Sequence, residues 1–179
     1  MFVTHVTEST SHPAYHFGMT LLRDTSRVDI EHGYFADILK NLVPDLPFGA
    51  LAALEDLHRQ RSYQCGELVH QEGAASQGVL LLYSGAVDIS ILDKRGRSIK
   101  LRQVLAPAIL GLNETVSDHV FKTRATCVKE LEAAFLPAAP FMNILRQFPM
   151  AGLQFSRLMS EDLTAMYIRL ADLRRPIGR

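Results

Sequence analysis

The chain has few cysteines and no long apolar run, and both absences exclude a class of protein. Its two cysteines, Cys65 and Cys127, lie far apart in the sequence, and two thiolates cannot supply a four-cysteine zinc or iron–sulfur site. No apolar run approaches the roughly 20 residues of a membrane span, and the N-terminus has no basic region followed by an apolar core. We therefore expect a cytoplasmic protein with reduced thiols and no membrane contact.

The chain also lacks a net charge. Nineteen Lys and Arg residues balance nineteen Asp and Glu residues. The overall charge therefore gives no reason to expect nucleic acid or an acidic membrane surface as a partner. At 179 residues, 47% of them hydrophobic, the chain is long enough to bury a core and has the composition of a globular protein.

The first 33 residues are polar and mixed, which predicts a flexible N-terminal tail. Four histidines, at positions 5, 12, 16 and 32, fall in this segment. Their spacings match no common metal site, and no cysteine or carboxylate cluster completes one, so we expect no bound metal.

Two short helices are predicted after the tail. Apolar residues recur at helical spacing from Tyr34 to Val43, and Pro44 ends this pattern. Pro47 then precedes a second helix, in which leucines at 51, 54 and 57 form a stripe.

The middle of the chain predicts many short strands with glycines between them. Strand candidates are residues 61–64, 68–71, 79–83, 86–92, 98–105, 123–129 and 131–136. Ser84 and Gly85 separate the third candidate from the fourth, and Asp93–Arg97 predicts a hairpin turn with a glycine at a positive φ. This pattern favours a β-sandwich or a small barrel of the jelly-roll kind.

Helices are predicted again after Pro137 and Pro140, which are expected to close the β region. Residues 141–148 predict a short helix and residues 150–173 a long amphipathic one. An apolar seam with 4-3-4-3 spacing runs along the long helix: Met159, Leu163, Met166, Leu170 and Leu173. The alternatives are that this seam packs on the chain's own barrel or that it pairs two copies. We favour a homodimer, because a complete barrel leaves little core for such a long helix to cover.

One stretch between the predicted strands has the residues of a phosphate pocket. The apolar run 108–110 ends at Gly111, a short polar segment with Glu114 follows, and Thr123 and Arg124 come shortly after. Glycine lets the backbone approach a ligand, amides at the start of a helical turn hold an anion, and arginine grips a phosphate with two hydrogen bonds. We therefore predict these four residues, Gly111, Glu114, Thr123 and Arg124, as ligand-binding residues.

The order of these elements resembles the cyclic-nucleotide-binding domain of the CRP/FNR regulator superfamily. The resembling segments are Tyr63–Val69, with the family's aromatic-x-x-Gly-Glu-x-apolar pattern, Glu72-Gly73, Gly78–Val87, with an apolar strand entering Ser-Gly-x-Val, and Ile109–Gly111, which leads into the phosphate cassette. The resemblance spans residues 34–173. It implies leading helices over 34–60, a jelly-roll β-barrel over 61–136, and a short helix and a long dimerisation helix over 137–173.

The chain departs from this family at the positions that hold the nucleotide. Family members that bind cyclic nucleotide have a Glu directly after the cassette glycine, on the ribose hydroxyl. They also have an Arg followed by a small residue, on the cyclic phosphate. Here Leu112 follows Gly111, and the nearest acid is Glu114.

The position of the phosphate-binding arginine has two interpretations. Arg124-Ala125-Thr126 fits the family's Arg-small-small pattern. Counting back from the last strand instead places Phe121 or Lys122 at that position. A shift of one residue reverses the face on which a strand residue lies, so the sequence alone does not orient Arg124.

We interpret the chain as a non-enzymatic sensor module that does not bind cyclic AMP in the family manner. It binds a different small effector or none. Two alternatives stay open: a genuine cyclic nucleotide sensor whose Glu114 and Arg124 act through a rearranged cassette, and the effector half of a truncated transcription regulator.

Catalysis and direct DNA binding are not expected. No Ser/His/Asp set has a recognisable context, Glu114 has no carboxylate partner nearby, and His70 and His119 are interpreted as surface or structural residues. Six residues follow Leu173, too few for the helix-turn-helix of the family's transcription factors. We therefore expect no sequence-specific DNA binding by this chain.

Overall fold

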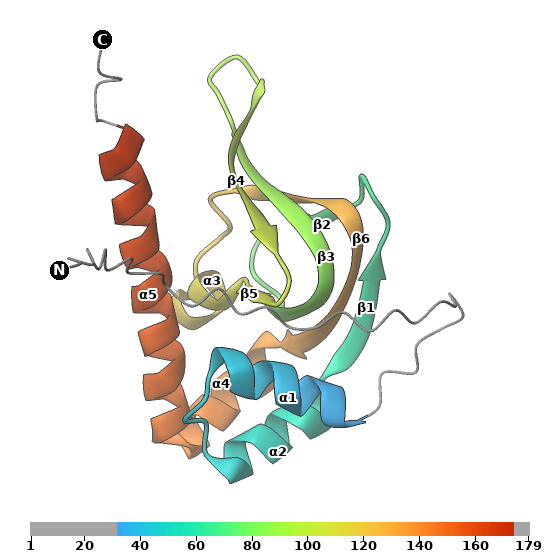
Figure 1. Ribbon diagram of the computed structural model, residues 1–179, viewed down its shortest axis with the longest axis vertical. Coiled ribbons are helices and arrows are strands. Elements are labelled where there is room, and N and C mark those ends of the chain that lie inside the picture. The colour runs from blue at the N-terminus through green and yellow to red at the C-terminus, as the bar shows by residue number, and fades with distance from the viewer. Residues whose placement is uncertain (1–31, 174–179) are drawn as a thin grey trace, which may run out of the picture.

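The computed structural model describes residues 32–173 (Figure 1). The elements are α1 (His32–Leu42), α2 (Phe48–Leu57), β1 (Arg59–Tyr63), β2 (Leu68–His70), β3 (Gly78–Leu92), β4 (Ser98–Leu105), β5 (Ala108–Leu110), α3 (Leu112–Ser117), β6 (Arg124–Pro137), α4 (Ala138–Gln147) and α5 (Pro149–Leu173). Residues 1–31 of the predicted tail and the last six residues lie outside the described part, while His32 and Gly33 open α1.

The strands form one antiparallel sheet that curls into a roll (Figure 1). Its six strands follow the order β1-β6-β3-β4, with β2 also paired to β6 and β5 to β3. The edge strands β1 and β4 do not pair with each other, so the roll stays open on one side. The predicted jelly-roll architecture with flanking helices is confirmed.

Two pairs of predicted strands are in fact continuous. Residues 78–92 form the single strand β3, and residues 124–137 form β6, because irregularities in pairing absorb the interruptions. The register of β3 on β6 shifts on both sides of Gly85, whose φ is 92°. A side chain at this glycine would overlap the carbonyl oxygen of Glu130, so the glycine permits a bulge and the strand continues past it.

Strand β3 is buried on both faces, and each face supplies a separate apolar cluster. Val79 and Leu81 point into a cluster that also contains residues of α1, α2, α4 and α5. Leu80 and Leu82 point into the roll, where they meet residues of β5 and β6. The alternation of a strand thus joins the helical layer to the interior of the roll.

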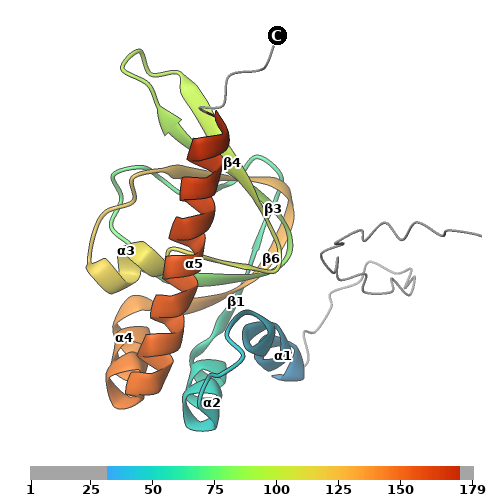
Figure 2. The same cartoon turned by 60° about the vertical axis from the view of Figure 1, so that its left-hand side comes forward.

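Helices α1, α2 and α4 gather at one end of the roll, and α5 runs from there along its side (Figure 2). Phe141 of α4 and Phe155 of α5 are fully buried and meet edge to face, with ring centroids 5.3 Å apart. Helix α4 begins three residues before its predicted start, since Pro140 falls in the first turn, where no backbone N–H is needed. Of the helices described, none has the length and apolar character required to cross a membrane.

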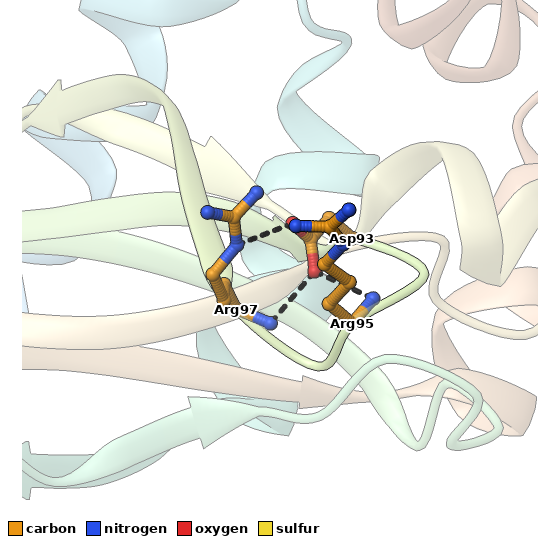
Figure 3. Close-up of polar contacts among 3 residues, drawn as sticks. All are labelled: Asp93, Arg95 and Arg97. Carbon is orange, nitrogen blue, oxygen red and sulfur yellow. Dashed lines mark hydrogen bonds and ion pairs between the residues drawn. The ribbon is translucent and has the colours of Figure 1, made fainter.

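The turn between β3 and β4 has the predicted form (Figure 3). Oδ1 of Asp93 accepts hydrogen bonds from the backbone N–H groups of Arg95 and Arg97, and Nε of Arg97 donates to Oδ2, all at 2.8 Å. The hydrogen bonds from Arg97, backbone first, lower the pKa of Asp93. Gly96 takes a positive φ of 75° in this turn.

Candidate ligand-binding site

The interior of the roll contains a cavity of about 210 Å³. Residues of β1, β2, β3, β5 and β6 line it together with the segments before β3, α3 and β6. They are Arg61, Tyr63, Val69, His70, Gln71, Ala74, Ala75, Gln77, Gly78, Leu80, Leu110, Gly111, Phe121 and Phe135. This lining includes aromatic rings and aliphatic side chains, one arginine and no carboxylate or thiol.

A stacked pair of rings forms one part of the cavity wall. The imidazole of His70 lies parallel to the Phe121 ring, with centroids 3.9 Å apart and an angle of 8° between the planes. Nε2 of His70 lies 3.3 Å from Oγ1 of Thr123. Burial lowers the pKa of His70 from 6.5 to about 4, so the imidazole is neutral at physiological pH.

Arg61, on strand β1, is the one positively charged residue that lines the cavity. Its guanidinium carbon lies 4.1 Å from the centroid of the Phe135 ring, a cation–π contact. Arg61 and Tyr63 also line an open groove on the outside, with Glu67 and Leu68. There the carboxylate of Glu67 accepts a hydrogen bond from the backbone N–H of Gln64, with 2.8 Å between N and Oε2. Between residues 32 and 173, no hydrogen-bond acceptor or carboxylate pairs with the Arg61 guanidinium.

The segment predicted as a phosphate cassette contains the expected glycine turn, but apolar side chains occupy the space around it. Gly111 has a φ of 75° and precedes α3, and Leu112 packs into the helical cluster instead of facing the roll interior. A Cβ atom at Gly111 would lie 3.5 Å from the Phe121 ring. Phe121 is buried and therefore fills the space beside the glycine turn.

The other predicted binding residues do not line the cavity. Glu114 lies on α3, where its backbone oxygen accepts a hydrogen bond from the N–H of His119 at 3.1 Å. Oγ1 of Thr123 lies 3.3 Å from Nε2 of His70. Of the four residues, the structure places only Gly111 at the cavity. A ligand-binding role for Glu114, Thr123 and Arg124 stays a prediction.

Strand alternation orients Arg124 away from the roll interior. Its neighbour Ala125 is fully buried inside the roll, as is Cys127 two residues further on. Arg124 therefore belongs to the opposite face of β6, where it lies across from Ser90 of β3. Its Nε is buried and has no acceptor among the described residues.

The predicted seam on α5 is exposed over most of its length. Leu163, Met166 and Leu170 are solvent-exposed, and Met159 is half-buried against the helical cluster. The side chain of Leu173 lies outside what the structure describes. Pairing of two copies through this seam stays a prediction.

A bidentate ion pair connects helix α5 to the edge strand β4. Arg102 of β4 donates to both carboxylate oxygens of Asp162, at 2.7 and 3.2 Å. The pair joins the edge strand β4 to the long helix α5.

In this chain a glycine turn lies beside the cavity of a β-roll, and a long helix follows the roll. Residues 60–148 match the family model described as the cyclic nucleotide-binding domain. Among curated proteins, cyclic GMP-binding protein C of Dictyostelium discoideum is 26% identical over 113 residues, which are 63% of this chain. The chain matches only 4% of the length of that protein.

Solved structures show the same fold at low sequence identity. The catabolite activator protein of Thermus thermophilus superposes with a TM-score of 0.63 at 20% identity, over 74% of this chain and 62% of that one. The sensor domain of the transcriptional regulator DNR from Pseudomonas aeruginosa gives a TM-score of 0.62 at 17% identity, over 83% of this chain and 98% of the other. The predicted family resemblance is confirmed.

Apart from Gly111, the residues that line the cavity were not predicted as ligand-binding residues. Arg61 was predicted only as part of a strand, and Tyr63 as part of that strand and of the family's aromatic pattern, although their spacing of two places both on one face. His70 was interpreted as a surface or structural residue, and it is half-buried in a ring stack. No local signal marks Phe121 as its partner, since the two residues meet only through pairing of distant segments.

Proposed function

We propose that this domain is a non-enzymatic regulatory module whose cavity does not bind cyclic AMP in the family manner. The observation that carries the proposal is the position of Phe121. Its ring fills the space beside the Gly111 turn, where the resemblance places the phosphate, while Arg124 lies on the outer face of β6.

The energetic argument concerns the phosphate charge. A charged group that enters a closed pocket without a partner loses hydration worth about 1–3 kcal/mol or more. Here the cavity wall offers an aromatic ring at the glycine turn, and its one charged side chain, Arg61, comes from β1 and not from that turn. Leu112 gives no acceptor for a ribose hydroxyl. Losing both specific partners removes most of the affinity for a cyclic nucleotide.

The non-enzymatic part of the proposal rests on the cavity lining. No carboxylate, hydroxyl of Ser or Thr, or thiol is among its residues. The histidine there is held neutral by burial and has no acid beside it in the cavity to orient it.

Titration calorimetry with cyclic AMP and cyclic GMP tests the proposal. We expect no micromolar binding to the wild-type chain and no change in the Arg124→Ala variant. The matched control is Lys129→Ala, which removes an exposed positive charge from the same strand. Micromolar binding to wild type that Arg124→Ala abolishes and Lys129→Ala preserves contradicts the proposal.

We further propose that two copies pair through the exposed seam of α5. Leu163 and Leu170 lie on one side of the helix, and burying two leucines is worth about 1.5–3 kcal/mol each. Charged substitutions, Leu163→Asp with Leu170→Asp, should shift the mass measured by sedimentation from dimer to monomer. Glu161→Lys is the control, because this residue lies roughly on the opposite side of the helix. A wild-type chain that sediments as a monomer contradicts this proposal.

A second candidate is a genuine cyclic nucleotide sensor with a rearranged cassette. The family match over residues 60–148, and a relative named as a cyclic GMP-binding protein, favour it. A thermal-shift screen separates the two candidates. A nucleotide at 100 times its dissociation constant stabilises the folded state by about 2.7 kcal/mol, and the leading proposal expects no shift.

A further inference from the structure

We propose that the roll cavity binds a small aromatic carboxylate, with the carboxylate on Arg61 and the ring against the aromatic wall. This inference rests on the proposed function, because it assigns a ligand class to a cavity that does not take cyclic nucleotides. It follows from the size, the lining and the charge of the cavity.

The size of the cavity favours a ligand of one ring. Its volume of about 210 Å³ equals the liquid volume of roughly seven water molecules. Pockets for drug-sized ligands are larger, at about 300–1,000 Å³. A single substituted ring fits a volume of this size.

The lining favours a flat apolar body. Four aromatic rings, those of Tyr63, His70, Phe121 and Phe135, surround the cavity with several aliphatic side chains. Aromatic pairs in offset or edge contacts contribute about 0.5–1.5 kcal/mol beyond their buried area. The imidazole of His70 adds no charge, so it contributes to this wall as a ring.

The charge of the cavity favours an anion. Arg61 is its one charged lining residue, and no carboxylate lines the cavity to neutralise it. Arg61 is solvent-exposed, and its contact with the Phe135 ring, at 4.1 Å, orients the guanidinium. Its N–H groups have no acceptor among the described residues. A guanidinium binds a carboxylate with two parallel hydrogen bonds, and fixing it beforehand lowers the entropy cost of binding.

Calorimetry on the whole chain with three probes tests the assignment: phenylacetate, its neutral analogue phenylacetamide, and butyrate. The amide keeps the ring and loses the charge, while butyrate keeps the charge and loses the ring. We expect saturable binding of phenylacetate and affinities about tenfold or more lower for both other probes, as loss of a charged hydrogen bond or an aromatic contact predicts.

Two arginine variants locate the carboxylate. Arg61→Met should remove the preference for phenylacetate over phenylacetamide and leave the circular dichroism spectrum unchanged. Arg59→Met is the matched control, because Arg59 is an exposed arginine on the same strand that lines neither the cavity nor the groove. Arg61→Lys retains the charge without the planar fork and should show an intermediate preference.

The outcomes separate this inference from the proposed function. It is overturned by absence of saturable phenylacetate binding, by equal binding of the acid and the amide, or by a preference that survives Arg61→Met. Those results leave the proposed function standing so long as cyclic nucleotides do not bind. Micromolar binding of cyclic AMP overturns the proposed function, and it overturns this inference as well if phenylacetate does not displace the nucleotide.

Discussion

Acid should destabilise this fold through His70 in a defined range of pH. Burial lowers the pKa of this histidine from 6.5 to about 4 in the folded protein. Between these values the unfolded chain binds a proton that the folded chain does not, so the free energy of unfolding falls as the pH falls through this range. Stability from this source is fully present above about pH 6.5, and the loss is complete near pH 4.

The magnitude follows from the difference between the two pKa values. A pKa of about 4 against 6.5 corresponds to about 3 kcal/mol at most. Part of the imidazole reaches solvent, so screening reduces the effect to about 1–2 kcal/mol. His70→Phe keeps a ring stacked on Phe121 and removes the proton-binding group.

Urea denaturation at several pH values, in wild type and His70→Phe, measures this effect. The wild type should lose about 1–2 kcal/mol more than the variant between pH 7 and pH 4.5. The other histidines and carboxylates are common to both proteins, so their contributions cancel in the comparison. The reasoning is refuted if the two proteins lose the same stability, or if NMR titration of His70 gives a pKa near 6.5.

Three further substitutions test the fold itself by denaturation. Gly85→Ala should cost about 3 kcal/mol or more, because φ is 92° and the new methyl group overlaps a backbone carbonyl; a cost below 1 kcal/mol contradicts the bulge. Phe141→Ala should cost about 3–5 kcal/mol, because the ring is fully buried against Phe155; an unchanged urea midpoint argues against this packing. Asp162→Asn should cost only about 0.5 kcal/mol, and less at high salt, since the ion pair with Arg102 is largely exposed; a loss above 2 kcal/mol shows that the pair holds α5 in place.

Local patterns predicted much of the fold. The helical faces of α1, α2 and α5 and the hairpin turn at Asp93 came directly from residue spacing, because 3.6-residue and two-residue periods reflect which face is buried. The pattern of glycines and strands also predicted the family resemblance. The predicted boundaries of strands and helices differed from the observed ones where glycine or proline permitted an element to continue, as at Gly85 in β3 and Pro140 in α4.

The candidate site could be predicted only in part. Gly111 was identified from the sequence and lies at the cavity. The orientation of Arg124 depends on the strand register, and the register of an irregular sheet cannot be derived from the sequence alone. The ring stack of His70 on Phe121 and the position of Arg61 over Phe135 join residues more than fifty positions apart.

The sequence by itself therefore determined the kinds of elements, their order and the glycine turn before α3, since each depends on neighbours within a few residues. Only the tertiary structure decided what fills the roll. Pairing of β1, β2, β3 and β6 brings aromatic side chains and one arginine around the space where the family resemblance implies a phosphate. Such contacts arise from the long-range register of strands, and the register is fixed by burial of whole faces and by bulges rather than by any local motif.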